Sequence, residues 1–221
     1  MLKGKKAVLF DLDGTLVDSM WVWSEVDIRY LGEMGLSVPA DLQEEIEGMG
    51  FTEVAEYFKK RFQISQDIEQ IKETWNILAM DAYQNQVKLK PGIRSFLTYL
   101  KSQNIRTAVA SSNSWELIEA VLKSHRIDRY FDCIVTSCEV QRGKPAPDVY
   151  LEAAGRLGVK PENCLVFEDI VAGIQSGKAA GMTTCAVEDA YSLAQREEKR
   201  RRADYYIESY DEVIKEALKE C

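Results

Sequence analysis

The chain has 221 residues, of which 46% are hydrophobic and 29% charged, a composition typical of a soluble globular protein and not of a disordered one. Its formal charge of −8 argues against broad binding to nucleic acid or to an anionic membrane. No apolar run approaches the roughly 20 residues that span a bilayer. The chain begins without a secretory signal and its five cysteines form no Cys-x-x-Cys pair, so we expect a cytoplasmic protein.

The first predicted strand, residues 7–10, is a run of four apolar residues of the kind found in buried parallel strands. Asp11 and Asp13 follow it directly, with Gly14 and Thr15. Because ligands of open α/β sheets bind beyond the carboxyl ends of the strands, we expect both aspartates to face a crevice. Two neighbouring carboxylates stay ionised only where a cation or hydrogen-bond donors compensate them. The pair therefore fits an aspartate nucleophile with an acid/base partner beside a metal ion.

An Asp-x-Asp pair also occurs in calcium loops and in ordinary polar turns. A helix-loop-helix calcium site has glycine at its sixth position and glutamate at its twelfth. Here Gly14 is fourth and Val22 is twelfth, so the spacing excludes that site. The polar turn stays open as an interpretation of these residues alone.

Residues 17–87 predict helices and no strand. We expect them over about 20–34, 41–47 and 52–62, with a fourth helix after Ser65 whose apolar residues recur every three or four positions. Asp18 or Ser19 can cap the first of them. We interpret residues 17–87 as an inserted α-helical cap domain, joined to the rest by crossings near Val17 and Lys88 that would act as a hinge.

Beyond Pro91 and Gly92, short apolar strands alternate with amphipathic helices. The strands are expected near 107–110, 133–136, 164–167, 183–187 and 205–207, and the helices near 93–102, 115–124, 147–157, 171–180, 192–200 and 210–220. This alternation predicts an α/β fold with a doubly wound, Rossmann-like parallel sheet. Residues 1–16 and 88–221 would form this core domain. We interpret the charged run 196–202 as a solvated helix end.

Two further segments suit the binding of an anion. Ser111 and Ser112 end a predicted strand, and the helix that follows presents free backbone N–H groups; Ser112, Asn113 or Ser114 can equally serve as its cap. Lys144 lies in a loop, just before Pro145 and Pro147, where its ammonium group suits phosphate. The Lys144–Pro145 bond is a candidate for the cis form, because the lysine must turn inward sharply from its loop and X–Pro bonds are the ones that adopt cis at low cost.

A second acidic pair, Glu168 and Asp169, ends a later predicted strand and repeats the pattern seen at Asp11. Carboxylates of Asp11 and Asp169, the carbonyl oxygen of Asp13 and several waters would together form an octahedral Mg²⁺ site.

Taken in order, Asp11-Leu12-Asp13-Gly14-Thr15, Ser111, Lys144 and Glu168-Asp169 resemble the signature of the haloacid-dehalogenase-like phosphatase superfamily. The loop around Lys144 and the helical insertion look like the β-phosphoglucomutase and phosphoglycolate phosphatase branch. The resemblance implies a Mg²⁺-dependent phosphatase that hydrolyses a small phosphorylated metabolite, such as a sugar phosphate, through an aspartyl-phosphate.

The resemblance also implies a role for each residue. Asp11 would attack phosphorus, and Asp13 would protonate the leaving oxygen and then activate water. Thr15 would support the loop that holds Asp13. The phosphoryl oxygens would be held by Ser111, Ser112 and Lys144, and Mg²⁺ by Asp11, Asp13, Glu168 and Asp169.

The sequence departs from the β-phosphoglucomutases at two positions of the predicted cap. Trp23 and Phe51 stand where those enzymes carry a histidine and an arginine that grips a distal phosphate. The missing cation argues for hydrolysis; a sugar-phosphate mutase stays the alternative, and a non-catalytic regulatory protein on the same fold a further one. Trp21, Trp23 and Phe51 are candidates for substrate contact or for the core of the cap. We expect a monomer that binds a small phosphorylated substrate, and neither nucleic acid nor membrane.

Overall fold

A six-stranded parallel sheet forms the centre of the protein in the computed structural model, which describes residues 1–219. The strand order is β5-β4-β1-β6-β7-β8, so β1 lies between β4 and β6. The strands are β1 (Ala7–Phe10), β4 (Arg106–Ser111), β5 (Cys133–Thr136), β6 (Cys164–Glu168), β7 (Thr183–Val187) and β8 (Tyr205–Ile207). This arrangement confirms the predicted doubly wound, Rossmann-like α/β fold.

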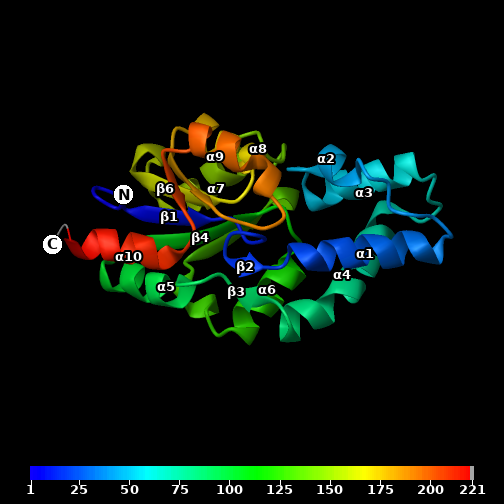
Figure 1. The fold of residues 1–221 in the computed structure, drawn as a ribbon, viewed down its shortest axis with the longest axis horizontal. Coiled ribbons are helices and arrows are strands. Elements are labelled where there is room, and N and C mark those ends of the chain that lie inside the picture. Colours follow the sequence, from blue (N-terminus) through cyan, green and yellow to red (C-terminus); the bar gives the residue numbers. More distant parts are fainter. Residues whose placement is uncertain (220–221) are drawn as a thin grey trace.

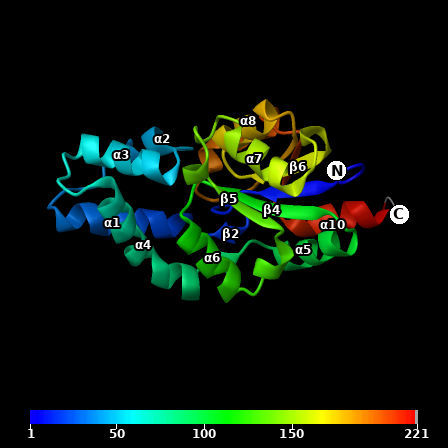
Figure 2. The ribbon, with the colours of Figure 1, turned by 180° about the vertical axis from the view of Figure 1, so that it is seen from behind.

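Helices cover both faces of the sheet, as Figures 1 and 2 show. One face carries α5 (Ile93–Ser102), α6 (Trp115–Ser124) and α10 (Tyr210–Lys219), and the other carries α7 (Asp148–Leu157), α8 (Val171–Ala179) and α9 (Arg196–Arg202). Short 3₁₀ turns complete the connections: η1 (Asp128–Tyr130), η2 (Ser137–Glu139), η3 (Pro161–Asn163) and η4 (Leu193–Gln195).

Strand β1 contributes side chains to two separate hydrophobic clusters. Val8 and Phe10 belong to the cluster that contains residues of α5, α6 and α10, whereas Ala7 and Leu9 belong to the one under α7. Successive strand residues point to opposite faces, and both faces are buried here. This explains why β1 is a continuous apolar run in the sequence.

Four helices lie beyond one end of the sheet, on the side away from the chain termini (Figure 1). They are α1 (Met20–Glu33), α2 (Leu42–Ile46), α3 (Phe51–Arg61) and α4 (Ile68–Asn85). Tyr30, Phe58 and Trp75 join three of these helices through ring contacts. Helix α4 also packs against α6 of the sheet layers. We refer to residues 17–87 below as the proposed cap.

The two connections between the proposed cap and the sheet layers form a short antiparallel ribbon. Strand β2 (Val17–Asp18) pairs with β3 (Lys88–Leu89). The expectation of no strand in residues 17–87 is therefore wrong at Val17 and Asp18. Two-residue strands carry no period of their own, and these form only because the departing and returning segments meet.

Lys199 corrects another expectation from the sequence. The run 196–202 does form α9, but the Lys199 side chain is buried inside the molecule. Its Nζ donates to the carbonyl of Val187 at 3.1 Å and to Ser192 Oγ at 2.8 Å. Only its neighbours along the run fit the solvated helix end that we expected. Across residues 1–219 the helices are too short or too polar to cross a membrane.

Candidate active site

Lys144 and Asp11 form a buried ion pair at the carboxyl end of β1. The distance from Lys144 Nζ to Asp11 Oδ1 is 2.6 Å, and the same Nζ lies 2.5 Å from Glu168 Oε1. The Lys144–Pro145 bond is cis, as expected. Asp11 and Glu168 lie 133 and 24 positions from Lys144 along the chain. Both reach its ammonium group because their strands, β1 and β6, are neighbours in the sheet.

Three carboxylates gather around this point. Asp11, Glu168 and Asp169 each have an oxygen within 4.8 Å of the others. Burial, opposed by Lys144 and reinforced by Glu168 and Asp13, raises the pKa of Asp11 to about 7. Burial and the charges of Asp11 and Glu168 raise the pKa of Asp169 well above its usual range. A buried set of hard oxygen donors with an excess of negative charge fits a divalent cation.

The backbone around Asp169 leaves room for its carboxylate. Gly14 has φ +79°, and a Cβ added there would lie 2.3 Å from Asp169 Oδ2. The hydroxyl of Thr15 donates to Asp169 Oδ1 at 3.1 Å, and its backbone amide donates to the carbonyl of Leu12. Thr15 therefore contacts both the carboxylate and the loop that carries Asp13.

Glu168 is enclosed by residues of α7 and α8. The hydroxyl of Tyr150, on α7, donates to Glu168 Oε1 at 2.6 Å. A Cβ at Gly173, on α8, would lie 1.9 Å from the Glu168 carboxyl carbon. Burial opposes the charged form of Lys144, but Asp11 and Glu168 together raise its pKa above the usual value. Glu168 thus holds the lysine in its charged form.

Asp13 accepts hydrogen bonds from three side chains. Ser19 Oγ donates at 2.5 Å, Asn113 Nδ2 at 2.8 Å, and the hydroxyl of Tyr83 also donates to it. Burial raises the pKa of Asp13, and the three hydrogen bonds oppose that shift. The Ser19 hydroxyl is used here, so α1 lacks the side-chain cap that we expected from it. Donors from α4 and the β4–α6 loop therefore meet on one carboxylate.

Sequence reasoning missed several of these contacts. Asn113 appeared there only as one possible helix cap, and Tyr83 and Tyr150 did not appear at all. Tyr83 lies on the buried face of α4, where an aromatic residue is equally typical of a core. No local pattern distinguishes the two roles.

Ser111 and Ser112 line the same cavity as Asp11 and Lys144. Ser111 Oγ accepts the backbone N–H of Asn113 at 3.1 Å, and the Ser112 hydroxyl lies 3.3 Å from that of Ser137. The cap of α6 is Ser114, which accepts from Leu117 N at 3.4 Å. The helix cap is thus a different residue from the two serines proposed to hold phosphate.

The cavity has a volume of about 770 Å³ and extends from the acidic cluster to the proposed cap. Trp23 and Phe51 both line it, with ring centroids 5.9 Å apart. Among the described lining residues Trp21 is absent, and its indole N–H donates to the carbonyl of Asp18 at 3.1 Å instead. Two of the three cap residues singled out from the sequence therefore face the candidate active site.

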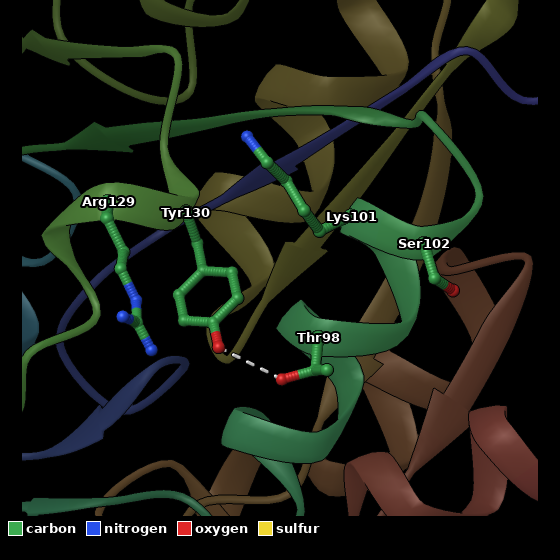
Figure 3. A pocket seen from close by; sticks show the side chains of 5 residues that line it. All are labelled: Thr98, Lys101, Ser102, Arg129 and Tyr130. Atoms are coloured by element: carbon green, nitrogen blue, oxygen red, sulfur yellow. Dashed lines mark hydrogen bonds between the residues drawn. The ribbon is translucent and has the colours of Figure 1, made fainter.

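A smaller hollow of about 400 Å³ lies between α5 and η1 (Figure 3). Thr98, Lys101, Ser102, Arg129 and Tyr130 line it, and the hydroxyls of Thr98 and Tyr130 are 3.0 Å apart. It shares no residue with the acidic cluster, so we do not include it in the candidate active site.

Comparison with known proteins shows which family and which fold the chain resembles. Residues 8–187 match the family model of the haloacid dehalogenase-like hydrolases. A phosphorylated carbohydrates phosphatase of Thermotoga maritima is 32% identical over 80% of this chain and 82% of that protein. A probable pseudouridine-5'-phosphatase of Drosophila melanogaster is 30% identical over 82% of this chain and 80% of that protein. The structure of a β-phosphoglucomutase from Clostridium difficile matches with a TM-score of 0.81 at 25% identity, covering 98% of this chain and 96% of that one.

Proposed function

The chain belongs to the haloacid dehalogenase-like hydrolase family as a phosphomonoester hydrolase, and we propose that it releases phosphate from a small phosphorylated metabolite through an aspartyl-phosphate on Asp11, with Mg²⁺ as cofactor. The buried contact of Asp11 with Lys144, beside two further carboxylates, is the observation that carries this proposal. It joins a nucleophile, a cation for the phosphoryl oxygens and a set of oxygen donors for a metal.

In the first proposed step, a carboxylate oxygen of Asp11 forms a bond to phosphorus while the bond from phosphorus to the ester oxygen breaks. Asp13 donates its proton to the departing oxygen. In the second step, water attacks phosphorus, Asp13 accepts its proton, and the Asp11 carboxylate is released with inorganic phosphate. The raised pKa of Asp13 suits a group that must carry a proton in one step and accept one in the next.

The proposed phosphate site is formed by one cation and two hydroxyls. Lys144 would pair with the phosphoryl oxygens, and Ser111 and Ser112 would donate hydrogen bonds at the N-terminus of α6. Asp11, Asp13, Glu168 and Asp169 are the residues proposed to hold Mg²⁺, which when bound neutralises charge between nucleophile and phosphate.

Transfer to a second position of a sugar is the alternative reaction, and the cavity argues against it. A mutase must retain a bisphosphate, which needs a cation for the distal phosphate. Among the described residues that line the cavity, Lys144 is the one basic residue. Trp23 and Phe51 line the cavity from the proposed cap. Hydrolysis therefore fits this lining better.

Purified protein tests the proposal. We expect phosphate release from p-nitrophenyl phosphate with Mg²⁺, its loss with a chelator, and recovery when Mg²⁺ is restored. Phosphorus NMR on hexose monophosphates separates the two reactions. Movement of the phosphate from one sugar position to another without its release would favour the mutase.

A further inference from the structure

Lys199 is a buried cation that the proposed chemistry does not use. Its side chain is 0% exposed, and its Nζ donates to the carbonyl of Val187 at 3.1 Å and to Ser192 Oγ at 2.8 Å. Both acceptors are neutral, and within residues 1–219 no carboxylate forms an ion pair with this ammonium group. Removing an ammonium group from water is costly unless negative charge or hydrogen bonds compensate it. A lysine in this setting therefore calls for negative charge nearby.

The acidic cluster lies beside the strand that Lys199 contacts. Strands β6 and β7 pair in a register that sets Glu168 beside Ala186. The next residue along the chain is Asp169 after Glu168 and Val187 after Ala186. Since neighbouring strands lie about 4.8 Å apart, the carbonyl that accepts from Lys199 is close to the backbone of Asp169. Lys199 thus lies one strand away from the proposed metal ligands.

The loop after β7 places a carboxylate beside this lysine. Asp189 is buried, and its Oδ2 pairs with Lys90 Nζ at 2.7 Å while its Oδ1 accepts the backbone N–H of Tyr191 at 2.8 Å. The Ser192 hydroxyl, which accepts from Lys199, donates to the carbonyl of Asp189 at 3.5 Å. These bonds fix one cation and one carboxylate in the same loop.

The cation already described at the site leaves one carboxylate without a charged partner. Lys144 pairs with Asp11 and with Glu168. The Asp169 carboxylate accepts from the hydroxyl of Thr15, which is a neutral donor. A buried carboxylate destabilises the fold unless something compensates it. Asp169 is therefore the member of the cluster for which a second cation matters most.

Lys199 and Asp189 act in opposite directions on this carboxylate. Burial, and then the charges of Asp11 and Glu168, raise the pKa of Asp169; Asp189 adds to that rise and Lys199 opposes it. Burial lowers the pKa of Lys199, and Asp169 and Asp189 oppose that shift, which favours the charged form. Inside a protein, where the effective dielectric constant is about 20, a unit charge acts over several ångströms.

We propose that Lys199 sets the affinity of the acidic cluster for its divalent cation. It acts through Asp169: its positive charge stabilises the cluster before the metal binds and opposes the metal when it binds. Asp189 acts in the opposite sense, because its negative charge favours the metal. This inference rests on the proposed function and concerns the regulation of its metal site.

Five proteins test this inference: the wild type, Lys199→Met, Lys199→Gln, Asp189→Asn, and Lys101→Met as a matched control. Methionine keeps the unbranched chain without charge, and glutamine also keeps a hydrogen-bond donor. Asparagine keeps an acceptor for Lys90. Lys101 is an exposed lysine of α5 that lines the smaller hollow. Calorimetric titration of the metal-free proteins with Mg²⁺, at about pH 8 where protons compete less with the metal, gives each Kd without turnover.

The expected shifts in Kd have opposite signs. Both Lys199 variants should bind Mg²⁺ about tenfold more tightly than the wild type, because a positive charge near the metal is removed. Asp189→Asn should bind it about tenfold more weakly, because a negative charge is lost and Lys90 is left unpaired. Lys101→Met should keep the wild-type Kd. Loss of structure alone would weaken binding in all three buried variants, so opposite shifts separate charge from structure.

Thermal unfolding provides a second measurement on the same proteins. The Lys199 variants should lose more stability in a chelator than in saturating Mg²⁺, because the metal replaces the missing positive charge. A lysine that only fills space would lower the melting temperature equally in both conditions. Equal losses would therefore contradict the inference.

Unchanged or weaker Mg²⁺ binding by the Lys199 variants would also overturn it. Either variant is sufficient, and if neither folds, Asp189→Asn with a wild-type Kd has the same meaning. Because calorimetry needs no turnover, a wild type that binds Mg²⁺ but hydrolyses no phosphate ester would contradict the proposed function alone, and the shifts in Kd would still decide this inference. A wild type that binds no Mg²⁺ would contradict both.

Discussion

Lys144 and Glu168 form a buried ion pair with 2.5 Å between Nζ and Oε1. This contact distinguishes the role of Glu168 from that of the adjacent Asp169. Tyr150 donates to the same Glu168 oxygen. Asp169, by contrast, accepts from the hydroxyl of Thr15 and lies against Gly14. We infer that Glu168 positions the lysine for phosphate, whereas Asp169 is the stronger candidate for a direct bond to the metal.

Conservative changes at these two acids should therefore affect different ligands. Asp169→Asn should raise the Mg²⁺ concentration for half-maximal activity by about tenfold or more, because a charged oxygen ligand is lost. Glu168→Gln should mainly weaken inhibition by inorganic phosphate, because Lys144 is less firmly held. Mg²⁺ titrations and phosphate inhibition constants measure the two effects. Equal changes in both variants would contradict the division of roles.

Asp11→Asn should abolish turnover while the fold is retained, because an amide cannot attack phosphorus. We expect less than about a thousandth of the wild-type rate, the scale of losing one essential catalytic group. Circular dichroism checks the fold, and rapid quench with a labelled substrate checks for a phosphoenzyme. Appreciable turnover, or a phosphoenzyme formed at the wild-type rate, would assign the nucleophile to another residue.

The sheet and the reacting residues could be predicted because their signals are local. Strand β1 is an apolar run that ends in Asp11, and the residues proposed to react follow strand ends, which meet at one edge of a parallel sheet. The ribbon of β2 and β3 could not be predicted, since its pairing depends on segments about seventy residues apart that only the fold brings together.

Residues that support the site were harder to predict for the same reason. Tyr83 and Asn113 reach Asp13 from 70 and 100 positions away. Asp27 is one acidic residue among 36, and only the packing of α1 and α2 shows that it is buried and faces the cavity. A single sequence predicts where the helices lie along the chain, but it does not predict which of their faces pack against each other.

Tyr83→Phe should slow hydrolysis of the phosphoenzyme by about tenfold, because a hydrogen bond that fixes the Asp13 carboxylate is lost. Formation of the phosphoenzyme from p-nitrophenyl phosphate needs little help from an acid and should change less. Rapid-quench kinetics separate the two steps, and Tyr205→Phe, at an exposed tyrosine of β8, is the control. Equal slowing of both steps would indicate general loss of structure.

Trp23 and Phe51 should influence the choice of substrate more than the chemistry. Both line the cavity from the proposed cap, so Trp23→Phe and Phe51→Leu should alter the ranking of sugar phosphates more than the rate with p-nitrophenyl phosphate. Trp21→Phe is the control, because the Trp21 indole bonds to Asp18 and is not part of the described lining. A ranking that changes equally in all three variants would contradict this.

Asp27→Asn should stabilise the protein at alkaline pH. Burial, opposed by the hydrogen bond from Gln43, raises the pKa of Asp27 from its ordinary value of 3.8 to about 7. Between about pH 4 and pH 7, Asp27 therefore keeps its proton in the folded state but loses it in the unfolded state. Its contribution to the free energy of unfolding falls as the pH rises through this range and stays low above it. Asparagine has no charge to bury and can still accept from Gln43.

We accordingly expect the variant to melt several degrees above the wild type at pH 8.5, with a smaller difference at pH 5.5, where wild-type Asp27 is mostly protonated. Asp11 and Asp169, whose pKa values are also raised, are present in both proteins and cancel in the comparison. Thermal unfolding followed by circular dichroism at both pH values provides the measurement, with Glu25→Gln as the exposed control. A difference in Tm that is the same at both pH values would mean that Asp27 does not titrate in this range.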